Sequence, residues 1–241
     1  MAKPLSDQVA LVTGATRGIG RAIAERLLEA GTRVVICSRR SEDVSRAVDE
    51  LSAQAGPGNV AGQGCDVGNY QAVVELFRFI QGTFGRLDVL VNNAGVGFFR
   101  PVDQIMPEDW RRTIDTNLTG VFYCTREAVP LMRKQGGGYI INIASLAGKN
   151  PLAGGSAYNA SKFGLIGLSE ASMLDLRYDN IRVSYIMPGS VATGFGGLSR
   201  GEDDWKIAPA DIADTVLHLL RSPNRTMASR VEMRPSKPPR R

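Results

Sequence analysis

The amino-acid sequence predicts an α/β fold, a doubly wound parallel sheet of about seven strands with helices on both faces. Two observations lead to this fold class. Short apolar runs rich in valine and isoleucine alternate with longer stretches of helical periodicity, the pattern of strands buried between two layers of helices. The first run stops at a glycine-rich turn that opens directly into a helical stretch. No repeat or linker divides the chain, so residues 1–233 are expected to form a single domain.

Composition and charge exclude several classes of protein. Of the 241 residues, 43% are hydrophobic and 22% charged, which is ordinary for a water-soluble domain with a large core. The formal net charge is +5, and the basic segment 234–241 is expected to be a disordered tail. That tail lacks interleaved aromatic residues and a nucleic-acid motif, so we expect no nucleic-acid partner. No apolar run approaches the roughly 20 residues that span a bilayer, so we expect no membrane span.

Cysteine usage and the start of the sequence favour a cytoplasmic protein. Cys37, Cys65 and Cys124 lack metal-site or Cys-x-x-Cys spacing, and two of them follow apolar runs. We therefore expect three reduced core thiols and no metal site. The first residues contain no signal-peptide hydrophobic region.

The first strand, turn and helix indicate a dinucleotide site. Gln8–Thr13 is expected to be a buried strand, and Arg21–Ala30 a helix closed by Gly31. The turn between them has the spacing G-x-x-x-G-x-G, which lets backbone N–H groups and a helix N-terminus approach a pyrophosphate. A tight turn without a ligand is the alternative. The candidate cofactor-binding residues of this turn are Gly14, Thr16, Arg17, Gly18, Ile19 and Gly20.

The second strand, Arg33–Cys37, predicts which nicotinamide cofactor binds. In dinucleotide folds the end of this strand meets the adenosine ribose, where a carboxylate binds the 2′-hydroxyl of NAD and a basic residue binds the 2′-phosphate of NADP. Here Ser38 and two arginines follow, and no carboxylate occurs before Glu42. Because guanidinium groups match phosphate geometry, Ser38 and Arg39 favour NADP(H) over NAD(H). Two solvated arginines that open a loop are the alternative.

The third strand, Asn59–Cys65, follows a predicted helix over Glu42–Gln54. Asp66 and Val67 come directly after it and could flank an adenine ring. They are therefore candidate cofactor contacts.

The fourth strand, Val89–Val91, follows a predicted helix over Tyr70–Phe84 and runs into Asn92, Asn93, Ala94 and Gly95. The amides could tie neighbouring strands together, while the two small residues would let a planar ligand lie close. Asn93, Ala94 and Gly95 are candidate cofactor contacts. A plain Asn-rich turn is the alternative.

The segment Pro107–Gln135 opens with Pro-Glu-Asp, which suits a helix start, but it is long for one straight helix. Asn117 and Gly120 are poor residues for a helix interior. Such a local conflict marks Asn117 as a kink or a functional position.

The C-terminal half continues the alternation of strands and helices. The expected elements are strands over Tyr139–Ile143, Arg182–Ile186 and Ser229–Met233 and a helix over Ala208–Leu220. Ser145 follows the first of these strands, and the second ends at Pro188-Gly189.

Tyr158 and Lys162 are the candidate centre for proton transfer. Four residues apart on a helix, they lie on one face within a few Å of each other. A nearby ammonium favours the phenolate, so Lys162 is expected to lower the pKa of Tyr158 from about 10. With a hydroxyl from Ser145, these groups could move a proton on and off a carbonyl oxygen. Taken alone, the pair could also be a partly exposed tyrosine beside a solvated lysine.

Together these residues resemble the short-chain dehydrogenase/reductase family, from Val9 to about Val231. The matching positions, in family order, are Thr13-Gly14, Gly18, Gly20, Asp66, Asn92-Asn93-Ala94-Gly95, Asn117, Ser145, Tyr158, Lys162, Pro188-Gly189 and Thr193. The resemblance implies a Rossmann fold.

The resemblance also implies roles for these residues. Tyr158 would give a proton to the carbonyl oxygen as hydride arrives or take one in oxidation, Lys162 would bond the nicotinamide ribose, and Ser145 would polarise the substrate oxygen. Asn117, through its kink, would hold a water in a proton relay to Lys162. The positions expected beside the nicotinamide are Pro188, Gly189, Val191 and Thr193.

Three functions fit this pattern. The first is an NADPH-dependent reductase of ketones or 3-oxoacyl compounds, similar to 3-oxoacyl-carrier-protein reductases. The second is a 3-hydroxy-acid or polyol dehydrogenase working in oxidation. The third is a non-catalytic NADP sensor, which the intact proton relay disfavours.

Two departures from the family pattern concern the substrate. The last strand lacks the usual glycine-rich ending, and its ending resembles that of reductases and hydroxy-acid dehydrogenases outside the fatty-acid-synthesis type. The segment after Pro188 is short and glycine-rich, with Gly194-Phe195-Gly196-Gly197, which predicts an open pocket. Arg133 is a candidate for docking an acidic carrier protein, but Asp175 stands near where a second basic docking residue is expected.

The helix of Tyr158 also predicts self-association. Ala160, Gly164, Gly167 and Ala171 share a stripe roughly opposite Tyr158. Two glycines in one helix cost about 1 kcal/mol each relative to alanine, so close approach of another backbone is a reason to keep them. Dimers of the family pack this helix against its copy, and a tetramer is favoured over a dimer. Close packing within the chain is the alternative.

Overall fold

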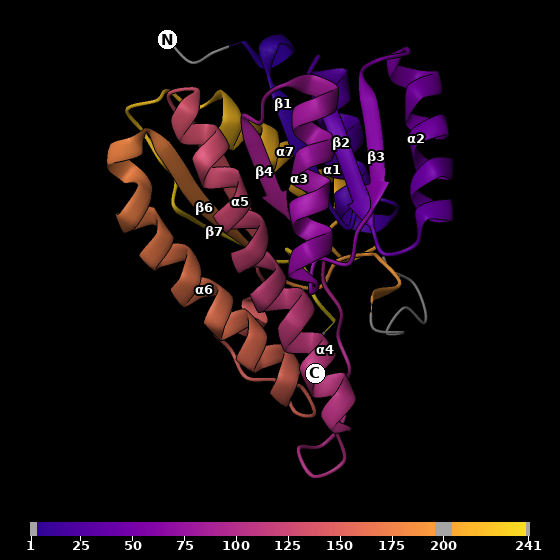
Figure 1. Cartoon of the computed structure of the whole chain (residues 1–241). Helices are drawn as coiled ribbons and strands as arrows, with labels where there is room; N and C mark the ends of the chain where they lie inside the picture. Colours follow the sequence, from indigo (N-terminus) through magenta and orange to yellow (C-terminus); the bar gives the residue numbers. More distant parts are fainter. Residues whose placement is uncertain (1–3, 196–203, 240–241) are drawn as a thin grey trace.

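The computed structural model describes residues 4–195 and 204–239. In these residues seven parallel strands form one sheet of order β3-β2-β1-β4-β5-β6-β7, with helices on both faces (Figure 1). The predicted doubly wound fold is confirmed. The strand order reverses between β1 and β4, the point where open α/β sheets place their ligands.

The elements follow the predicted alternation with small shifts at their ends. The strands are β1 (Val9–Thr13), β2 (Arg33–Ser38), β3 (Val60–Gly64), β4 (Val89–Asn92), β5 (Gly138–Ile143), β6 (Ile181–Pro188) and β7 (Arg230–Met233). The helices are α1 (Gly18–Glu29), α2 (Ser41–Ala55), α3 (Tyr70–Phe84), α4 (Pro107–Ile114), α5 (Gly120–Lys134), α6 (Ser156–Leu176) and α7 (Pro209–Arg221). Short 3₁₀ turns lie at η1 (Leu5–Asp7), η3 (Leu146–Gly148) and η4 (Arg177–Asp179).

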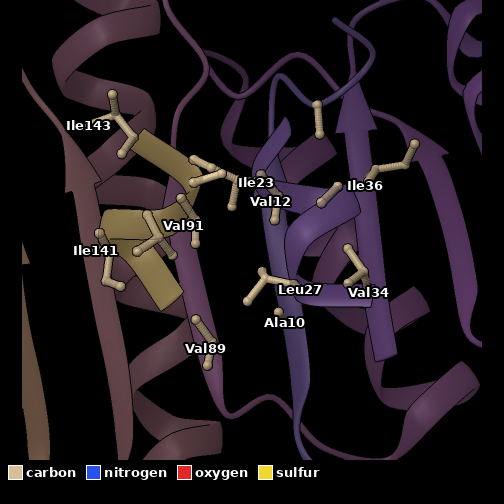
Figure 2. Packing of buried hydrophobic residues seen from close by; sticks show 14 of the residues in the cluster. Ala10, Val12, Ile23, Leu27, Val34, Ile36, Val89, Val91, Ile141 and Ile143 are labelled. Carbon is tan, nitrogen blue, oxygen red and sulfur yellow. The ribbon is translucent and has the colours of Figure 1, made fainter. Parts of the chain in front are cut away.

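The sheet is buried on both faces, so its strands read as continuous apolar runs. In β1, Ala10 and Val12 pack in the cluster that holds Ile23 and Leu27 of α1 (Figure 2). Leu11 points to the other face and packs in the cluster that α3 and α5 complete. Each fully buried aliphatic side chain contributes about 1.5–3 kcal/mol. Packing on both faces of the sheet therefore fixes the positions of the strand ends, where the candidate active site forms.

The long segment predicted over Pro107–Gln135 is interrupted where expected. Helix α4 passes into a π-helical turn, η2 (Asp115–Thr119), before α5 begins. A π turn carries one residue more than an α turn. It therefore interrupts the regular hydrogen-bond ladder of the helix and shifts the directions of its side chains. Asn117 stands in the middle of this turn and is fully buried.

The three cysteines lie in the core and form no disulfide. No helix within the described ranges 4–195 and 204–239 is long and apolar enough to cross a membrane.

Candidate active site

The predicted site residues gather at the carboxyl ends of the strands, the lower edge of the sheet in Figure 1. There β1 passes into the glycine-rich turn, β4 into the Asn-Asn-Ala-Gly segment, and β5 into Ser145. Because β1, β4 and β5 are neighbours in the sheet, these segments meet although they lie far apart in the sequence.

The glycine-rich turn fits a pyrophosphate. Helix α1 begins at Gly18 with Arg17 as its N-cap, and the Arg17 side chain makes no capping hydrogen bond, so the first N–H groups of the helix remain available for an anion. Gly14 and Gly18 have φ values of 66° and 59°, which glycine adopts without strain. A Cβ at Gly14 would lie 2.8 Å from Ala94 Cα, so this close approach needs a glycine.

The turn and the end of β4 are fastened together by Thr13 and Asn93. The Thr13 hydroxyl accepts hydrogen bonds from the backbone N–H groups of Asn93 and Ala94, both at 3.0 Å. Asn93 Nδ2 donates to the carbonyls of Thr13 (2.9 Å) and Gly14 (3.1 Å). Asn93 thus shapes the cradle through its side chain. The sequence predicts Thr13 as a strand end and as a position that matches the family, but assigns it no role; a threonine directly before the glycine turn is the signal that could have identified that role.

The adjacent amide, Asn92, ties strands together as predicted. Its Nδ2 donates to Asn142 Oδ1 of β5 at 2.9 Å, and Asn142 Nδ2 donates to the Ser169 hydroxyl of α6 at 2.8 Å. This buried chain connects β4, β5 and the helix of Tyr158. The Asn142 amide is paired through both its oxygen and its nitrogen, which is the condition for burying an amide at low cost.

The arginines after β2 differ in their partners. Arg40 Nε is bound to Asp43 Oδ2 at 2.7 Å. Arg39 and Arg17 are exposed, and neither has an ion pair or side-chain hydrogen bond in the described part of the chain. Their guanidinium groups are therefore available to a ligand at the cradle.

Of the two candidate residues that follow β3, Asp66 lies at the surface and Val67 in the core. Asp66 is exposed, and its Oδ1 accepts from Gly68 N at 3.0 Å. Val67 is only 5% exposed and packs against Gly120, where a Cβ would come within 2.8 Å of its Cγ2. The Val67 side chain is thus part of the core, so only its backbone could border an adenine ring.

Lys162 and Tyr158 occupy one face of α6, as their spacing predicts. Lys162 is buried, and its Nζ donates to the backbone carbonyl of Ile143, at the end of β5, at 2.9 Å. Burial lowers the pKa of Lys162 to about 8. One of three ammonium protons is used by this hydrogen bond, which leaves two for a ligand or water.

The expected effect of Lys162 on Tyr158 is wrong for the structure as it stands. Burial raises the pKa of Tyr158, and a hydrogen bond with Ser145 only partly offsets that rise. The Lys162 Nζ lies 5.8 Å from the centroid of the Tyr158 ring and is bonded to Ile143 instead. The prediction from spacing took account of the ammonium but not of the burial of the phenol.

The side chain of Asn117 is fully engaged in holding the segment after β4. Its Oδ1 accepts from Val96 N at 2.8 Å, and its Nδ2 donates to Val96 O (2.9 Å) and to the Ser161 hydroxyl (3.1 Å). A water in a relay to Lys162 would therefore have to bind the backbone of the π turn. The relay remains a prediction.

The loop before α6 is held by Asn159. Asn159 Oδ1 accepts from Leu152 N at 3.0 Å, and Nδ2 donates to Ala147 O (2.5 Å) and Asn150 O (3.0 Å). The Ser145 hydroxyl accepts from Ala147 N at 3.1 Å. Asn159 lies between Tyr158 and Lys162 in sequence, and nothing in its spacing signalled this role.

Two phenylalanines flank the Tyr158 ring. The ring centroids of Phe99 and Phe195 lie 5.5 and 5.7 Å from that of Tyr158. Gly97 lies beneath them, since a Cβ there would come within 2.9 Å of Phe195 and 3.0 Å of Phe99. Sequence reasoning missed both rings as site residues, because they come from segments far apart in the chain.

The segment after β6 lies against the glycine turn. Gly189 N donates to Met233 O at 2.8 Å, which fixes the end of β6 against β7. Thr193 lies over Gly18, where a Cβ would be 3.4 Å from its Cγ2, and Val191 pairs with Ile207. The remaining glycines of the predicted short lid, at 196 and 197, lie outside the described residues.

A family profile and a curated relative match the chain over most of its length. The profile described as short chain dehydrogenase matches residues 8–203. An uncharacterised oxidoreductase of Staphylococcus aureus (strain USA300) is 34% identical over 231 residues, which cover 96% of this chain and 98% of that protein.

Solved structures agree with the fold and with a nicotinamide ligand. A metagenomic short-chain oxidoreductase in complex with NADP has 39% identity and a TM-score of 0.85, covering 98% of this chain and 100% of that one. A 3-ketoacyl-(acyl-carrier-protein) reductase from Brucella melitensis complexed with NADH has 26% identity and a TM-score of 0.88, covering 96% and 98%.

Proposed function

Since this chain belongs to the short-chain dehydrogenase family of NAD(P)-dependent oxidoreductases, we propose that it uses NADPH to reduce a ketone or 3-oxoacyl carbonyl to an alcohol. The observation that carries the proposal is the arrangement of Ser145, Tyr158 and Lys162 beside a glycine cradle with two free arginines. The cofactor supplies hydride when it is bound. The chain supplies the glycine cradle that would hold the cofactor, the proton, and the surface that would contact the substrate.

The cradle favours NADP(H). Among the residues that the structure describes Arg39 has no ion pair, whereas Arg40 is held by Asp43. An unpaired guanidinium at the end of β2 is suited to a 2′-phosphate, which it can bind through two parallel hydrogen bonds. The metagenomic relative with 39% identity was solved with NADP.

Tyr158 can supply the proton for reduction. A reductase needs a proton donor at neutral pH, and a dehydrogenase needs a base. Burial raises the pKa of Tyr158 above its ordinary value, so the phenol is protonated at pH 7. It can then donate to the carbonyl oxygen, with the Ser145 hydroxyl close enough to polarise the same oxygen. The two remaining protons of Lys162 would bond the nicotinamide ribose.

The surface beside Tyr158 favours an apolar carbonyl compound free in solution. Phe99 and Phe195 are the side chains packed on the Tyr158 ring, and both are uncharged. Arg133, the candidate for docking an acidic carrier, is already bound to Asp179 at 2.7 Å. An apolar substituent on the ketone would pack against these rings, while a carrier-bound substrate would have to displace an ion pair.

The proposed activity can be tested by following NADPH loss at about 340 nm with ketones, 3-oxo thioesters and hydroxy acids. We expect turnover with ketones that carry an aromatic or bulky aliphatic group. Tight NADPH binding without turnover of any compound would favour a sensor instead. Faster oxidation of hydroxy acids with NADP⁺ would favour a dehydrogenase.

Phe195→Ala tests the substrate surface. An aromatic pair contributes about 0.5–1.5 kcal/mol beyond its buried area, so kcat/KM for an aryl ketone should fall roughly tenfold. A small aliphatic ketone is expected to make little contact with the ring, so its kcat/KM should change less than about twofold. Tyr178→Ala, at an aromatic that is 91% exposed, is the control. Equal losses for both ketones would contradict the role given to Phe195.

We propose that the outer face of α6 mediates self-association. Ala160, Phe163, Gly167, Ala171 and Leu174 are exposed and follow one another at helical spacing. The predicted stripe is wrong at Gly164, where a Cβ would lie 2.8 Å from Leu118 of the same chain. Gly164 is therefore explained by packing within the subunit. The position that is open is Gly167, where a Cβ meets nothing within 4 Å.

Gly167→Leu is expected to lower the molar mass observed by sedimentation, because a larger side chain would hold the two helices apart. The matched control is Gly82→Leu in α3, where an added Cβ also meets nothing. Both variants should keep the monomer fold, and only Gly167→Leu should dissociate the oligomer. If the two variants sediment like the parent, α6 is not the interface.

A further inference from the structure

A cavity of about 570 Å³ lies at the amino ends of the strands, the opposite edge of the sheet from the candidate active site. The amino ends of the strands form the upper edge of the sheet in Figure 1. Its lining includes Gln8, Asp88 and Ile181, which stand beside the starts of β1, β4 and β6, and the loop after α7. This volume is within the range of small-molecule sites, which runs from about 300 to 1,000 Å³. The proposed reaction makes no use of it.

The lining of this cavity is strongly basic. Four arginines contribute to it, namely Arg86, Arg177, Arg182 and Arg225, against one acidic residue, Asp88. Asp88 is already bonded, since its carboxylate accepts from Arg86 at 2.6 and 2.7 Å and from Val9 N at 2.9 Å. The positive charge of the other three arginines is therefore not balanced within the cavity.

Arg182 is the fixed member of the group. It is half-buried, its guanidinium lies 4.1 Å from the centroid of the buried Tyr139 ring, and it donates to Ser222 O at 3.1 Å. No carboxylate pairs with it in residues 4–195 and 204–239. Burial lowers the pKa of Arg182, because the charge loses water without gaining a counter-charge. An anion in the cavity would supply that counter-charge.

Arg177 and Arg225 stand at the rim. Both are exposed, and neither has an ion pair or a side-chain hydrogen bond in the described ranges. Gly136, Gly137 and Gly138 also line the cavity and contribute backbone without side chains, and a Cβ on Gly136 would meet nothing within 4 Å.

We propose that this cavity binds a small phosphorylated anion through Arg182, with Arg177 and Arg225 closing on the same ligand. Guanidinium groups bind phosphate oxygens through paired hydrogen bonds, and several of them lining one cavity suit a ligand with more than one negative charge. A cavity of about 570 Å³ fits a small molecule better than a nucleic-acid strand, which needs an extended basic groove with stacking aromatics. The inference does not depend on the proposed carbonyl reduction.

The test is calorimetric titration of the whole protein with inorganic tripolyphosphate at about 50 mM salt, where charge screening is weak. Saturating NADP⁺ in both solutions keeps the glycine cradle filled. The parent protein should bind tripolyphosphate, and the double variant Arg177→Gln/Arg225→Gln should bind it at least about tenfold more weakly. Both substituted side chains are exposed, so the fold should be retained.

The control carries the same change of charge elsewhere. Arg78→Gln/Lys237→Gln removes two exposed cations that do not line the cavity, and it should bind tripolyphosphate as the parent does. Equal weakening in both double variants would mean a general surface-charge effect and would overturn the site, as would the absence of binding to the parent. Tighter binding of citrate than of tripolyphosphate would overturn the assignment to phosphate. None of these readouts uses turnover, so they remain valid if the protein reduces no carbonyl.

Discussion

Replacing Tyr158 with phenylalanine is expected to lower turnover about 1,000-fold, because a positioned proton donor contributes roughly 10²- to 10⁴-fold to a rate. The ring would remain between Phe99 and Phe195, and only the hydroxyl would be lost. NADPH binding should change less than about threefold, since most cofactor contacts come from the glycine cradle and the arginines. Single-turnover NADPH oxidation and fluorescence titration of NADPH measure the two effects separately.

Tyr185→Phe is the control for the loss of a tyrosine hydroxyl. Tyr185 is buried, and its hydroxyl donates to Glu170 at 2.6 Å, so its removal costs a hydrogen bond without touching the proposed chemistry. Turnover by Tyr185→Phe should stay near that of the parent. If Tyr158→Phe retained more than a tenth of the activity, Tyr158 would not be the proton donor.

Arg39→Asp is expected to reverse the cofactor preference. It removes a charge-assisted hydrogen bond to the 2′-phosphate, worth about 1.5–3 kcal/mol, and adds a like charge beside it. The Kd for NADPH should rise about 100-fold or more, while the Kd for NADH should fall or stay the same. The ratio of the two dissociation constants, measured on one preparation, is the decisive quantity.

Arg78→Asp makes the same change of charge on the exposed face of α3 and should leave that ratio unchanged. Parallel losses of NADPH and NADH affinity in Arg39→Asp would refute a contact with the 2′-phosphate. They would indicate damage to the cradle as a whole. The preference for NADP(H) would then have to come from Arg17 or Ser38.

The sequence predicted the fold and the order of its elements because both depend on local patterns. Buried parallel strands need continuous apolar runs, and Gly14 and Gly18 are required by a turn that few other residues can make. The interruption at Asn117 was also predicted, because Asn117 and Gly120 are poor residues for a helix interior. Because the strands are parallel, their carboxyl ends then meet at one edge of the sheet.

The properties that sequence reasoning missed depend on packing between distant segments. Phe99 and Phe195 meet over Tyr158 only after the chain has folded, and the raised pKa of Tyr158 follows from that burial. Gly164 faces Leu118 of its own chain, which no helical wheel shows. Spacing identifies which residues share a face, but only the fold decides what covers that face.

The π turn at Asp115–Thr119 has a consequence for how this segment can change in evolution. One regular α-helix running through α4 and α5 would set the rotation of α4 about the helix axis. The extra residue of the π turn changes that rotation by about 100°. Deleting one residue there would restore a regular helix and rotate Asn117 away from Val96, which its amide holds by two hydrogen bonds. The length of this segment is therefore constrained independently of its composition, and insertions or deletions should be selected against even where substitutions are tolerated.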